Sequence, residues 1–323
     1  MQDQQIHIVF ASNHAYLQGL CATAVSMLRA SSEPARLTYH VISDGLTEDD
    51  KRTFADLCLK FGYTGGVDFR SQDMQYFKSS LKAFHGSHTT YARLHFPSVF
   101  QDLDWILWTD VDVLWFRDPA MLWEERAHAV SLVWCPDFRQ SQIESSPYFK
   151  SFFPSYDNRH YCCAGVMLMN LKRLREKNFE DRCDTFIREH GTPEHVDQDI
   201  LNAMCYGDTK IVDRKWDILD PCFNLMDGIV LHFQGIGSLF NKPFSHWHPA
   251  YEIWFRHYAQ VIEGRTCAHV VSLKLRLLYN LLGLIRTPYW ICRAFSLLTL
   301  GKVKANNLYR PLYFCWLRNR LSW

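Results

Sequence analysis

The stretch WILWTDVDVLW, residues 105–115, places Asp110 and Asp112 directly after an apolar run. Trp105–Trp108 predict a buried strand, and Thr109 leads from it to the carboxylates. Burial penalises two bare carboxylates, and charges this close raise at least one pKa. A divalent cation would remove both penalties, and hard oxygen ligands suit Mg²⁺ or Mn²⁺. A solvated acidic turn is the alternative, because so short a motif often occurs by chance.

Apolar runs on both sides of this stretch predict an α/β fold. Strands and helices alternate at short intervals, which favours a mostly parallel sheet with helices on both faces. Ligands bind beyond the carboxyl ends of such strands, so polar residues directly after strands become candidates for a site. The expected strands are Ile6–Ala11, Arg36–Ile42, Val67–Arg70, Trp105–Trp108, Val130–Trp134, Gly165–Leu168 and Val230–Phe233; the expected helices are Leu20–Leu28, one capped by Thr47, His88–Phe96 and Asp199–Cys205.

Two polar clusters farther along the chain could complete a site. His232 follows an apolar run, and an imidazole would be a third metal ligand that suits Mn²⁺ better than Mg²⁺. A satisfied histidine at a strand end is the alternative. Gly235 would let backbone N–H groups approach phosphate, and Lys242 could add a positive charge. Gln198 could hydrogen-bond a sugar hydroxyl, whereas Asp199 could be a helix N-cap.

Charge divides the chain into an acidic body and a basic tail. Residues 264–323 carry ten Lys or Arg and no Asp or Glu, although the net charge of all 323 residues is only +1. Spaced cations among nine aromatics predict helices lying on an anionic membrane surface, with a basic packing subdomain as the alternative. The tail is too apolar for a nucleic-acid stripe, so no nucleic-acid partner is expected.

The cysteines and the first residues favour the cytoplasm. Eleven cysteines, an odd number without a CxxC pair, are typical of a reducing compartment. No signal peptide is expected, because the apolar run Ile6–Phe10 is short and lacks a basic flank. We therefore expect a cytoplasmic protein, peripheral on the inner face of the plasma (inner) membrane. The sequence predicts nothing about oligomeric state.

Six stretches occur in an order that resembles family 8 (GT8) retaining glycosyltransferases, close in pattern to bacterial lipopolysaccharide galactosyl- and glucosyltransferases. They are IVFAS (8–12), TTYARL (89–94), WILWTDVDVLW (105–115), CAGVMLMNLKRLR (163–175), DQDILNA (197–203) and LHFQG (231–235). The resemblance implies a GT-A nucleotide-sugar-binding domain with a mostly parallel mixed sheet over residues 1–263, followed by the basic, aromatic helical tail of 264–323. It also implies Mn²⁺, with Mg²⁺ as the alternative, and UDP-galactose or UDP-glucose as donor.

By position, the same resemblance implies roles for individual residues. Asp110, Asp112 and His232 match the metal ligands. His85 lies where the family contacts the acceptor, and Gln198 and Asp199 match positions at the reaction centre. The positions that match donor contacts are Ala11, Asn13, Arg93, Asp110, Val111, Asp112, Ala164, Gly165, Asp197, Gln198, Gly235 and Lys242. The chain departs from the family at Cys163, where asparagine is usual.

The implied reaction moves a hexose to an envelope glycan, such as lipopolysaccharide core or another surface polysaccharide. Because Gln198 is a poor nucleophile, front-face attack is favoured, with Asp199 or Asp197 as an alternative nucleophile. Two other functions stay open: another metal-dependent nucleotide-processing transferase, and a non-catalytic sugar-nucleotide-binding protein at the membrane.

Overall fold

The computed structural model of the protein describes residues 5–84, 86–137, 160–219 and 230–232. The chain divides into two compact units, and these residues belong to the first, which comprises residues 1–219 and 226–240. His85, Gly235, Lys242 and the expected tail of 264–323 lie outside the described residues. Among the helices that are described, none is long and apolar enough to cross a membrane.

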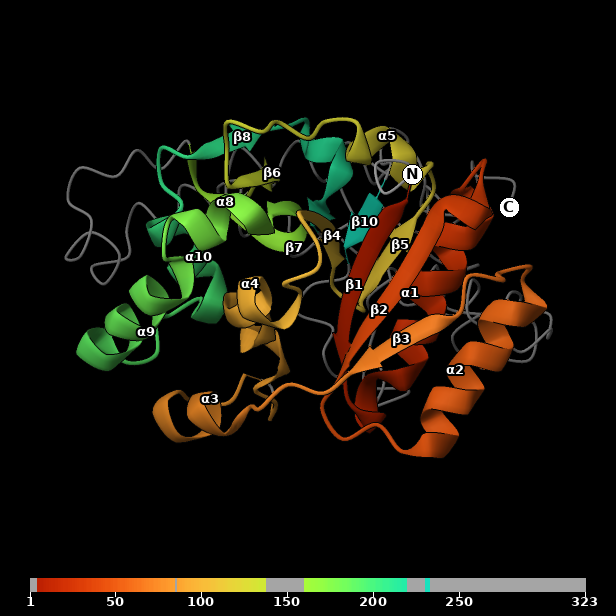
Figure 1. Cartoon of the computed structure of the whole chain (residues 1–323), viewed down its shortest axis with the longest axis horizontal. Coiled ribbons are helices and arrows are strands. Elements are labelled where there is room, and N and C mark those ends of the chain that lie inside the picture. Colours follow the sequence, from red (N-terminus) through yellow and green to blue (C-terminus); the bar gives the residue numbers. More distant parts are fainter. Residues whose placement is uncertain (1–4, 85, 138–159, 220–229, 233–323) are drawn as a thin grey trace, which may run out of the picture. The chain divides into compact units, whose positions relative to one another are not determined.

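A seven-stranded mixed sheet forms the centre of this unit, in the order β3-β2-β1-β4-β7-β6-β8 (Figure 1). The four strands from β3 to β4 are parallel, β7 runs antiparallel to both β4 and β6, and β8 is parallel to β6. The predicted mostly parallel sheet is therefore confirmed. The strands are β1 (Ile6–Ser12), β2 (Leu37–Ser43), β3 (Val67–Arg70), β4 (Trp105–Thr109), β6 (Leu132–Pro136), β7 (Cys162–Asn170) and β8 (Thr209–Ile211).

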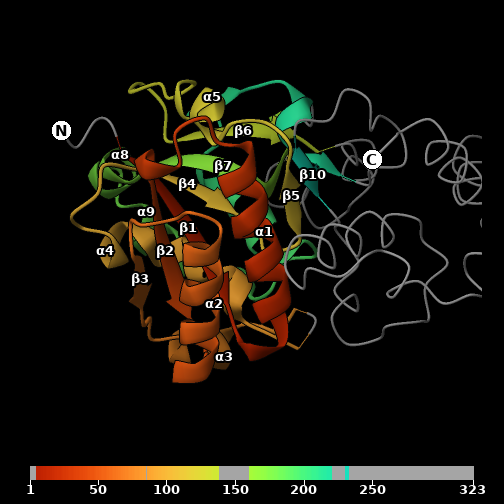
Figure 2. The same cartoon turned by 90° about the vertical axis from the view of Figure 1, so that its right-hand side faces the viewer.

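Helices cover both faces of the sheet. α1 (Leu17–Ala30) and α2 (Glu48–Lys60) lie on one side, while α4 (Phe96–Val99), α8 (Leu171–Glu176) and α9 (Phe179–His190) lie on the other (Figure 2). Thr47 caps α2 as predicted: its hydroxyl accepts the N–H of Asp50, whose carboxylate accepts the N–H of Thr47. The remaining helices are α3 (Gln75–Ser80), α5 (Pro119–Trp123) and α10 (Val196–Met204).

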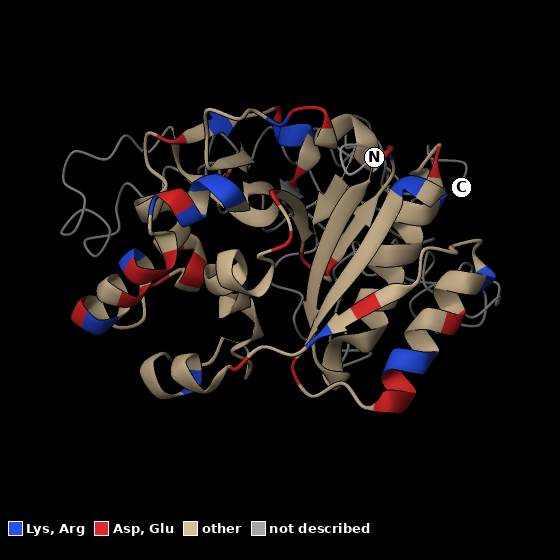
Figure 3. Cartoon of the chain, in the orientation of Figure 1, with Lys and Arg blue, Asp and Glu red and all other residues tan. Residues whose placement is uncertain are grey.

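Charged residues occur mainly in the helices and loops at the periphery, whereas the central strands contain few of them (Figure 3). Every residue of β4 and of β7 is buried, which explains why their sequences are nearly continuous apolar runs. Carboxylates at the end of β4 therefore stand out from a core of low polarity.

Two predicted helices have different bounds or geometry. The stretch predicted as a helix from His88 to Phe96 is a 3₁₀ helix, η4 (Thr89–His95). Side chains three apart line up in a 3₁₀ helix, so Thr90 and Arg93 share one side. The helix α10 begins at Val196 after the N-cap His195, so the prediction of Asp199 as N-cap is wrong.

A smaller sheet of three short strands, β5 (Val113–Trp115), β10 (Val230–His232) and β9 (Ile218–Leu219), joins distant parts of the chain. The strand β10 runs antiparallel to β5, and this register pairs His232 with Val113. Because Val113 follows Asp112 directly, the pairing brings His232 to the carboxylates from about 120 residues away in sequence.

The strand order reverses at β1, which has β2 on one side and β4 on the other. At such a switch point, the connections leave the adjacent carboxyl ends in opposite directions and open a crevice for ligands. Here those ends carry Asn13 after β1 and Asp110 after β4.

Candidate active site

A pocket of about 800 Å³, counted with its open mouth, occupies this crevice. It brings together seven of the residues predicted to form the site: Ala11, Asn13, Arg93, Asp110, Val111, Asp112 and His232. The other lining residues, which the sequence did not single out, are Ser12, Tyr16, Phe84, Ser87, Thr89, Thr90 and Trp108. Five predicted residues, Ala164, Gly165, Asp197, Gln198 and Asp199, are described but do not line it.

Asp110, Asp112 and His232 converge on one wall of the pocket. The Nε2 atom of His232 lies 3.3 Å from Oδ1 of Asp112 and 3.7 Å from Oδ2 of Asp110. One donor atom from each residue lies within 4.8 Å of the others. The carboxylates keep 26% and 23% of their exposure, whereas the imidazole keeps only 2%. Two oxygen donors open to the pocket and one nitrogen behind them fit Mn²⁺ or Mg²⁺.

Burial and mutual charge set the protonation of this group. Burial raises the pKa of Asp110 above its ordinary value, against the opposing charge of Arg93. Burial also disfavours the charged form of Asp112, yet the neighbouring His232 lowers its pKa below the usual value. Burial opposes charge on His232 too, but Asp217 and Asp112 raise its pKa well above normal. The carboxylates therefore attract positive charge to the place where a cation would bind.

Arg93 links the carboxylate turn to the rest of the site. Its guanidinium, 3% exposed, donates to Oδ1 of Asp110 at 2.8 Å and lies 3.1 Å from Oδ2 of Asp197. It also donates to the carbonyl oxygen of Ala164 and lies over the ring of Trp108, 4.1 Å from the centroid. Although Arg93 lines the pocket, most of its hydrogen-bonding capacity is taken by these protein groups.

The Asp197-Gln198-Asp199 cluster lies in the first turn of α10, beneath β7 rather than on the pocket wall. Ala164 donates its N–H to Oε1 of Gln198 at 3.0 Å, and Nε2 of Gln198 donates to Asp137 at 2.9 Å. The backbone donor and the carboxylate acceptor thereby fix the orientation of the Gln198 amide, with Oε1 toward Ala164 and Nε2 toward Asp137. Asp137 was not anticipated from the sequence.

Asp199 is held by two donors. Its Oδ1 accepts the hydroxyl of Tyr161 at 2.6 Å, and its Oδ2 accepts the N–H of His195 at 2.9 Å. Asp197 accepts the hydroxyl of Thr90 at 2.6 Å. The hydroxyl of Tyr161 also accepts Nε2–H of Gln198 at 3.1 Å, so it links Gln198 to Asp199, and the side chains of Asp197, Gln198 and Asp199 are all buried.

A bulge in β7 shapes the wall behind His232. Trp134 of β6 pairs with Met167, but the next residue, Cys135, pairs with Cys163, so the residues between protrude from the ladder. Gly165 lies in this bulge and accepts the N–H of Asp110 at 2.8 Å through its carbonyl oxygen. A Cβ on Gly165 would lie 2.2 Å from the imidazole of His232. The glycine is therefore required by the histidine ring.

Asp217 is a second buried carboxylate that, like Asp137, was not anticipated from the sequence. It lies just before β9 and accepts Nδ1–H of His232 at 2.9 Å. Its only sequence signal is a position between Trp216 and a short apolar pair, which does not distinguish it from other aspartates in turns.

The fold and the site together define a GT-A-like glycosyltransferase: a mostly parallel sheet carries a carboxylate–histidine group beside the crevice at its switch point. The family model described as Glycosyl transferase family 8 matches residues 7–236. The chain therefore belongs to glycosyltransferase family 8.

Curated relatives and solved structures agree with this assignment. General stress protein A of Bacillus subtilis is 24% identical over 75% of this chain and 81% of its own length. Lipopolysaccharide 1,3-galactosyltransferase of Salmonella typhimurium is 23% identical over 75% of this chain and 74% of its own. An active-site mutant of LgtC superposes with a TM-score of 0.67 and 24% identity, covering 84% of this chain and 99% of LgtC. Galactosyltransferase LgtC in complex with donor and acceptor sugar analogs gives 0.65 and 23%, with the same coverage.

Proposed function

We propose that the protein is a Mn²⁺-dependent, retaining hexosyltransferase that uses UDP-galactose or UDP-glucose. One observation carries the proposal: Asp110, Asp112 and His232 converge on the wall of the switch-point pocket, which Ala11 and Asn13 also line. That arrangement suits a diphosphate at the metal ligands with its nucleoside against the end of β1. The similarity of the chain to a lipopolysaccharide galactosyltransferase supports a hexose donor.

In this proposal Asp110, Asp112 and His232 would hold the cation, and a bound cation would neutralise charge on the departing diphosphate. Arg93 keeps Asp110 in place through Oδ1, so that Oδ2 is directed toward His232. Asp197, held by Thr90 and facing Arg93, orients the sugar through its hydroxyls. These buried ion pairs fix the donor-binding groups before substrate arrives, which lowers the ordering cost of binding.

We propose front-face attack at the anomeric carbon. The bond from that carbon to the UDP oxygen breaks, the bond to the acceptor oxygen forms on the same face, and the acceptor proton passes to the released UDP. Gln198, a neutral amide anchored by Asp137 and Ala164, supports the positive charge on the sugar. The hydrogen bonds from Tyr161 and His195 to Asp199 weigh against the alternative in which Asp199 is the nucleophile.

The acceptor is proposed to be an envelope glycan or glycolipid, such as lipopolysaccharide core. The basic, aromatic stretch of 264–323 is proposed to hold the enzyme, as a peripheral cytoplasmic protein, against an anionic membrane surface. His85 as an acceptor contact, and Gly235 and Lys242 as donor contacts, remain predictions, since they lie outside the described residues.

A donor screen tests the proposal. Release of UDP is measured for UDP-galactose, UDP-glucose and UDP-galacturonic acid, each with Mn²⁺, with Mg²⁺ and with a chelator. The third donor is included because relatives from Arabidopsis thaliana are named probable galacturonosyltransferase-like proteins. Release with one hexose donor that stops in chelator supports the proposal, whereas full activity in chelator overturns its metal dependence.

The same assay separates the alternatives. A nucleotidyltransferase would release no UDP from these donors but would form a nucleotide–sugar bond from a nucleoside triphosphate. A non-catalytic binding protein would bind UDP-sugar and Mn²⁺ without turnover in the presence of any acceptor.

A further inference from the structure

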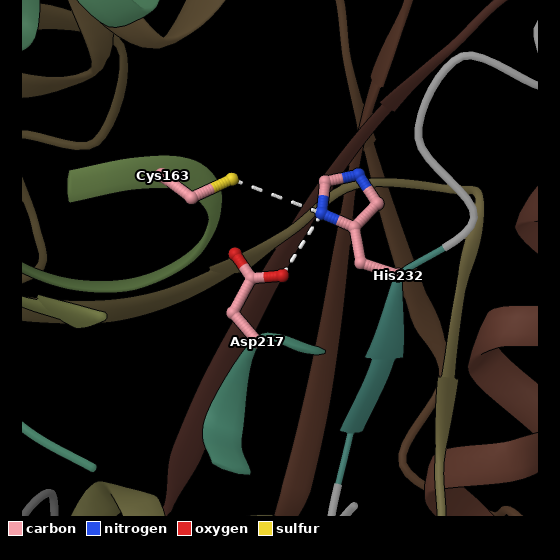
Figure 4. A group of neighbouring side chains, drawn as sticks. All are labelled: Cys163, Asp217 and His232. Atoms are coloured by element: carbon pink, nitrogen blue, oxygen red, sulfur yellow. Dashed lines mark hydrogen bonds and ion pairs between the residues drawn. The ribbon is translucent and has the colours of Figure 1, made fainter. Parts of the chain in front are cut away.

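The far side of the His232 ring faces a second buried group, formed by Asp217 and Cys163 (Figure 4). Nδ1 of His232 lies 2.9 Å from Oδ1 of Asp217 and 3.9 Å from Sγ of Cys163. The side chain of Asp217 has no exposure, and its Oδ2 accepts no hydrogen bond from the described residues. Burying a carboxylate with one unsatisfied oxygen is costly, so Asp217 needs an explanation beyond packing.

We infer that Asp217 is a positioning residue for the metal ligand His232. The inference rests on the proposed function, in which Nε2 of His232 binds the cation. A neutral imidazole carries one N–H and one lone pair, and only the nitrogen with the lone pair can bind a metal. Because Asp217 accepts Nδ1–H, Nε2 is the nitrogen whose lone pair is left for a cation once the cation has displaced any proton there, and Nε2 points toward Asp110 and Asp112. A metal-bound histidine commonly donates its other N–H to a carboxylate in this way.

The surrounding backbone fixes the angle of the ring. Gly165 presents bare backbone to it, and a Cβ there would lie 2.2 Å from Cε1 of the imidazole. The strand β10 sets the position of the histidine Cα by pairing with β5. Backbone therefore determines where the ring lies, and Asp217 determines which nitrogen faces the carboxylates.

A second cation bound by Cys163, Asp217 and Nδ1 is the rival interpretation, because these donor atoms also lie within 4.8 Å of one another. Two observations favour the positioning role. The 2.9 Å distance between Asp217 and Nδ1 is already that of a hydrogen bond. All three side chains are buried, and burial raises the pKa of the Cys163 thiol, which disfavours the thiolate that a metal would need.

Two substitutions of similar shape test whether Asp217 acts through its hydrogen-bond acceptor or only through the shape of its side chain. Asn and Leu branch at the same carbon as Asp, but only Asn keeps an oxygen that can accept Nδ1–H. Mn²⁺ binding to the full chain is titrated with and without UDP, and free Mn²⁺ is measured by electron paramagnetic resonance. We expect D217L to bind Mn²⁺ roughly 10–100-fold more weakly and D217N to stay within about fivefold of wild type. Circular dichroism in the absence of metal checks that both variants are folded.

H232A distinguishes failure of this inference from failure of the proposed function. If H232A leaves Mn²⁺ affinity unchanged, the proposed ligand set is wrong. If H232A weakens binding but D217L does not, the ligand set stands and the positioning role is wrong. In the H232A background D217L should not lower Mn²⁺ affinity further, because Asp217 acts on the metal only through the His232 ring. An equal loss in that background would indicate a general structural role and overturn the inference.

Cobalt tests the rival site directly. Co²⁺ bound to a thiolate gives a sulfur-to-metal charge-transfer absorption, which Co²⁺ bound to oxygen and nitrogen does not. We expect no charge-transfer band that depends on Cys163, so the Co²⁺ spectra of wild type and C163S should match. C163S should also bind Mn²⁺ like wild type. A band that is lost in both C163S and D217L would place the cation on the Nδ1 side and overturn the positioning role.

Discussion

Asp110 and Asp112 lie on one turn but have different neighbours. Oδ1 of Asp110 accepts hydrogen bonds from Arg93 and from Nε1 of Trp108, while its Oδ2 faces His232. Oδ1 of Asp112 lies 3.3 Å from Nε2 of His232. Both carboxylates therefore present an oxygen to the same point, and each is held there by different groups.

Substituting Asp112 should remove cation binding while leaving the fold intact. D112N keeps the shape but removes the negative charge, so we expect Mn²⁺ affinity and Mn²⁺-dependent UDP release to fall by about 100-fold or more. Titration with Mn²⁺ and the UDP-release assay measure the two effects. The matched control is D56N, because Asp56 is an exposed aspartate on α2, far from the carboxylate turn in sequence. Wild-type Mn²⁺ affinity in D112N would argue against Asp112 as a ligand.

Gly165 should tolerate no side chain while His232 is present. In G165A the methyl group would lie 2.2–2.4 Å from the ring, so the bulge or the ring must move. We expect a loss of roughly 1–3 kcal/mol in unfolding free energy, together with weaker Mn²⁺ binding. Urea unfolding of G165A, H232A and the double variant measures this. Removal of the ring should relieve the clash, so costs that simply add would contradict the steric explanation.

At the scale of elements, the site depends on irregular segments more than on long ones. The 3₁₀ winding of η4 puts Thr90 and Arg93 on one side, and the bulge in β7 admits the His232 ring. The three-residue strand β10 contributes a predicted metal ligand through a single register. The 3₁₀ helix, the bulge and the short strand are each local features, but each contributes to the site only through contact with another element.

Asp208 lies outside the pocket, directly before β8, and contacts residues of two other elements, α8 and the segment that leads into β6. It accepts hydrogen bonds from Arg173 of α8 at 2.7 Å and from Ser131, which precedes β6. Lys177 lies 2.9 Å away. Although burial acts in the opposite direction, these donors lower the pKa of Asp208 to about 2.

The lowered pKa of Asp208 predicts how stability depends on pH. A carboxyl group whose folded pKa lies below its unfolded value of about 3.9 stabilises the fold above that value. The stabilisation is lost as pH falls from about 4 toward about 2. We expect D208N to be less stable than wild type by about 1–2 kcal/mol near neutral pH, after allowance for solvent screening. Urea unfolding at about pH 6 and about pH 3 should show this difference shrinking in acid; a constant difference would contradict the assignment.

At the scale of the whole molecule, the distribution of charge predicts where the enzyme works. The basic stretch of 264–323 has no acidic residue to oppose its attraction to anionic lipid. Such attraction is screened by salt, whereas insertion of apolar side chains is not.

Removal of residues 264–323 should abolish membrane association without removing the donor site. We expect the full chain to sediment with vesicles that contain anionic lipid, and the shortened chain to stay in the supernatant. The shortened chain should still bind Mn²⁺ and UDP, because the proposed metal ligands all lie before residue 233. Vesicles of neutral lipid are the control, and retained sedimentation of the shortened chain would refute the prediction.

The sequence alone determined the class of fold and the residue types of the proposed metal ligands. Apolar runs of strand length placed β1 and β4, because burial on both faces selects such runs. Two carboxylates after one of these runs indicated the switch-point pocket, and His232 was selected by its residue type and position. These features are encoded locally, so they can be recognised without knowing what lies beside them.

Only the tertiary structure decided what each polar group faces. It put Asp217 behind His232, committed both oxygens of Asp199 to Tyr161 and His195, and assigned Gly165 to the clearance of a ring. Each of these contacts joins segments at least four residues apart, and most join segments far more distant. Register and bulges set such contacts, and a shift of one residue would send the side chains to the opposite face. Asp110 and Asp112 could be found by reading along the chain, but the carboxylate behind their histidine could not.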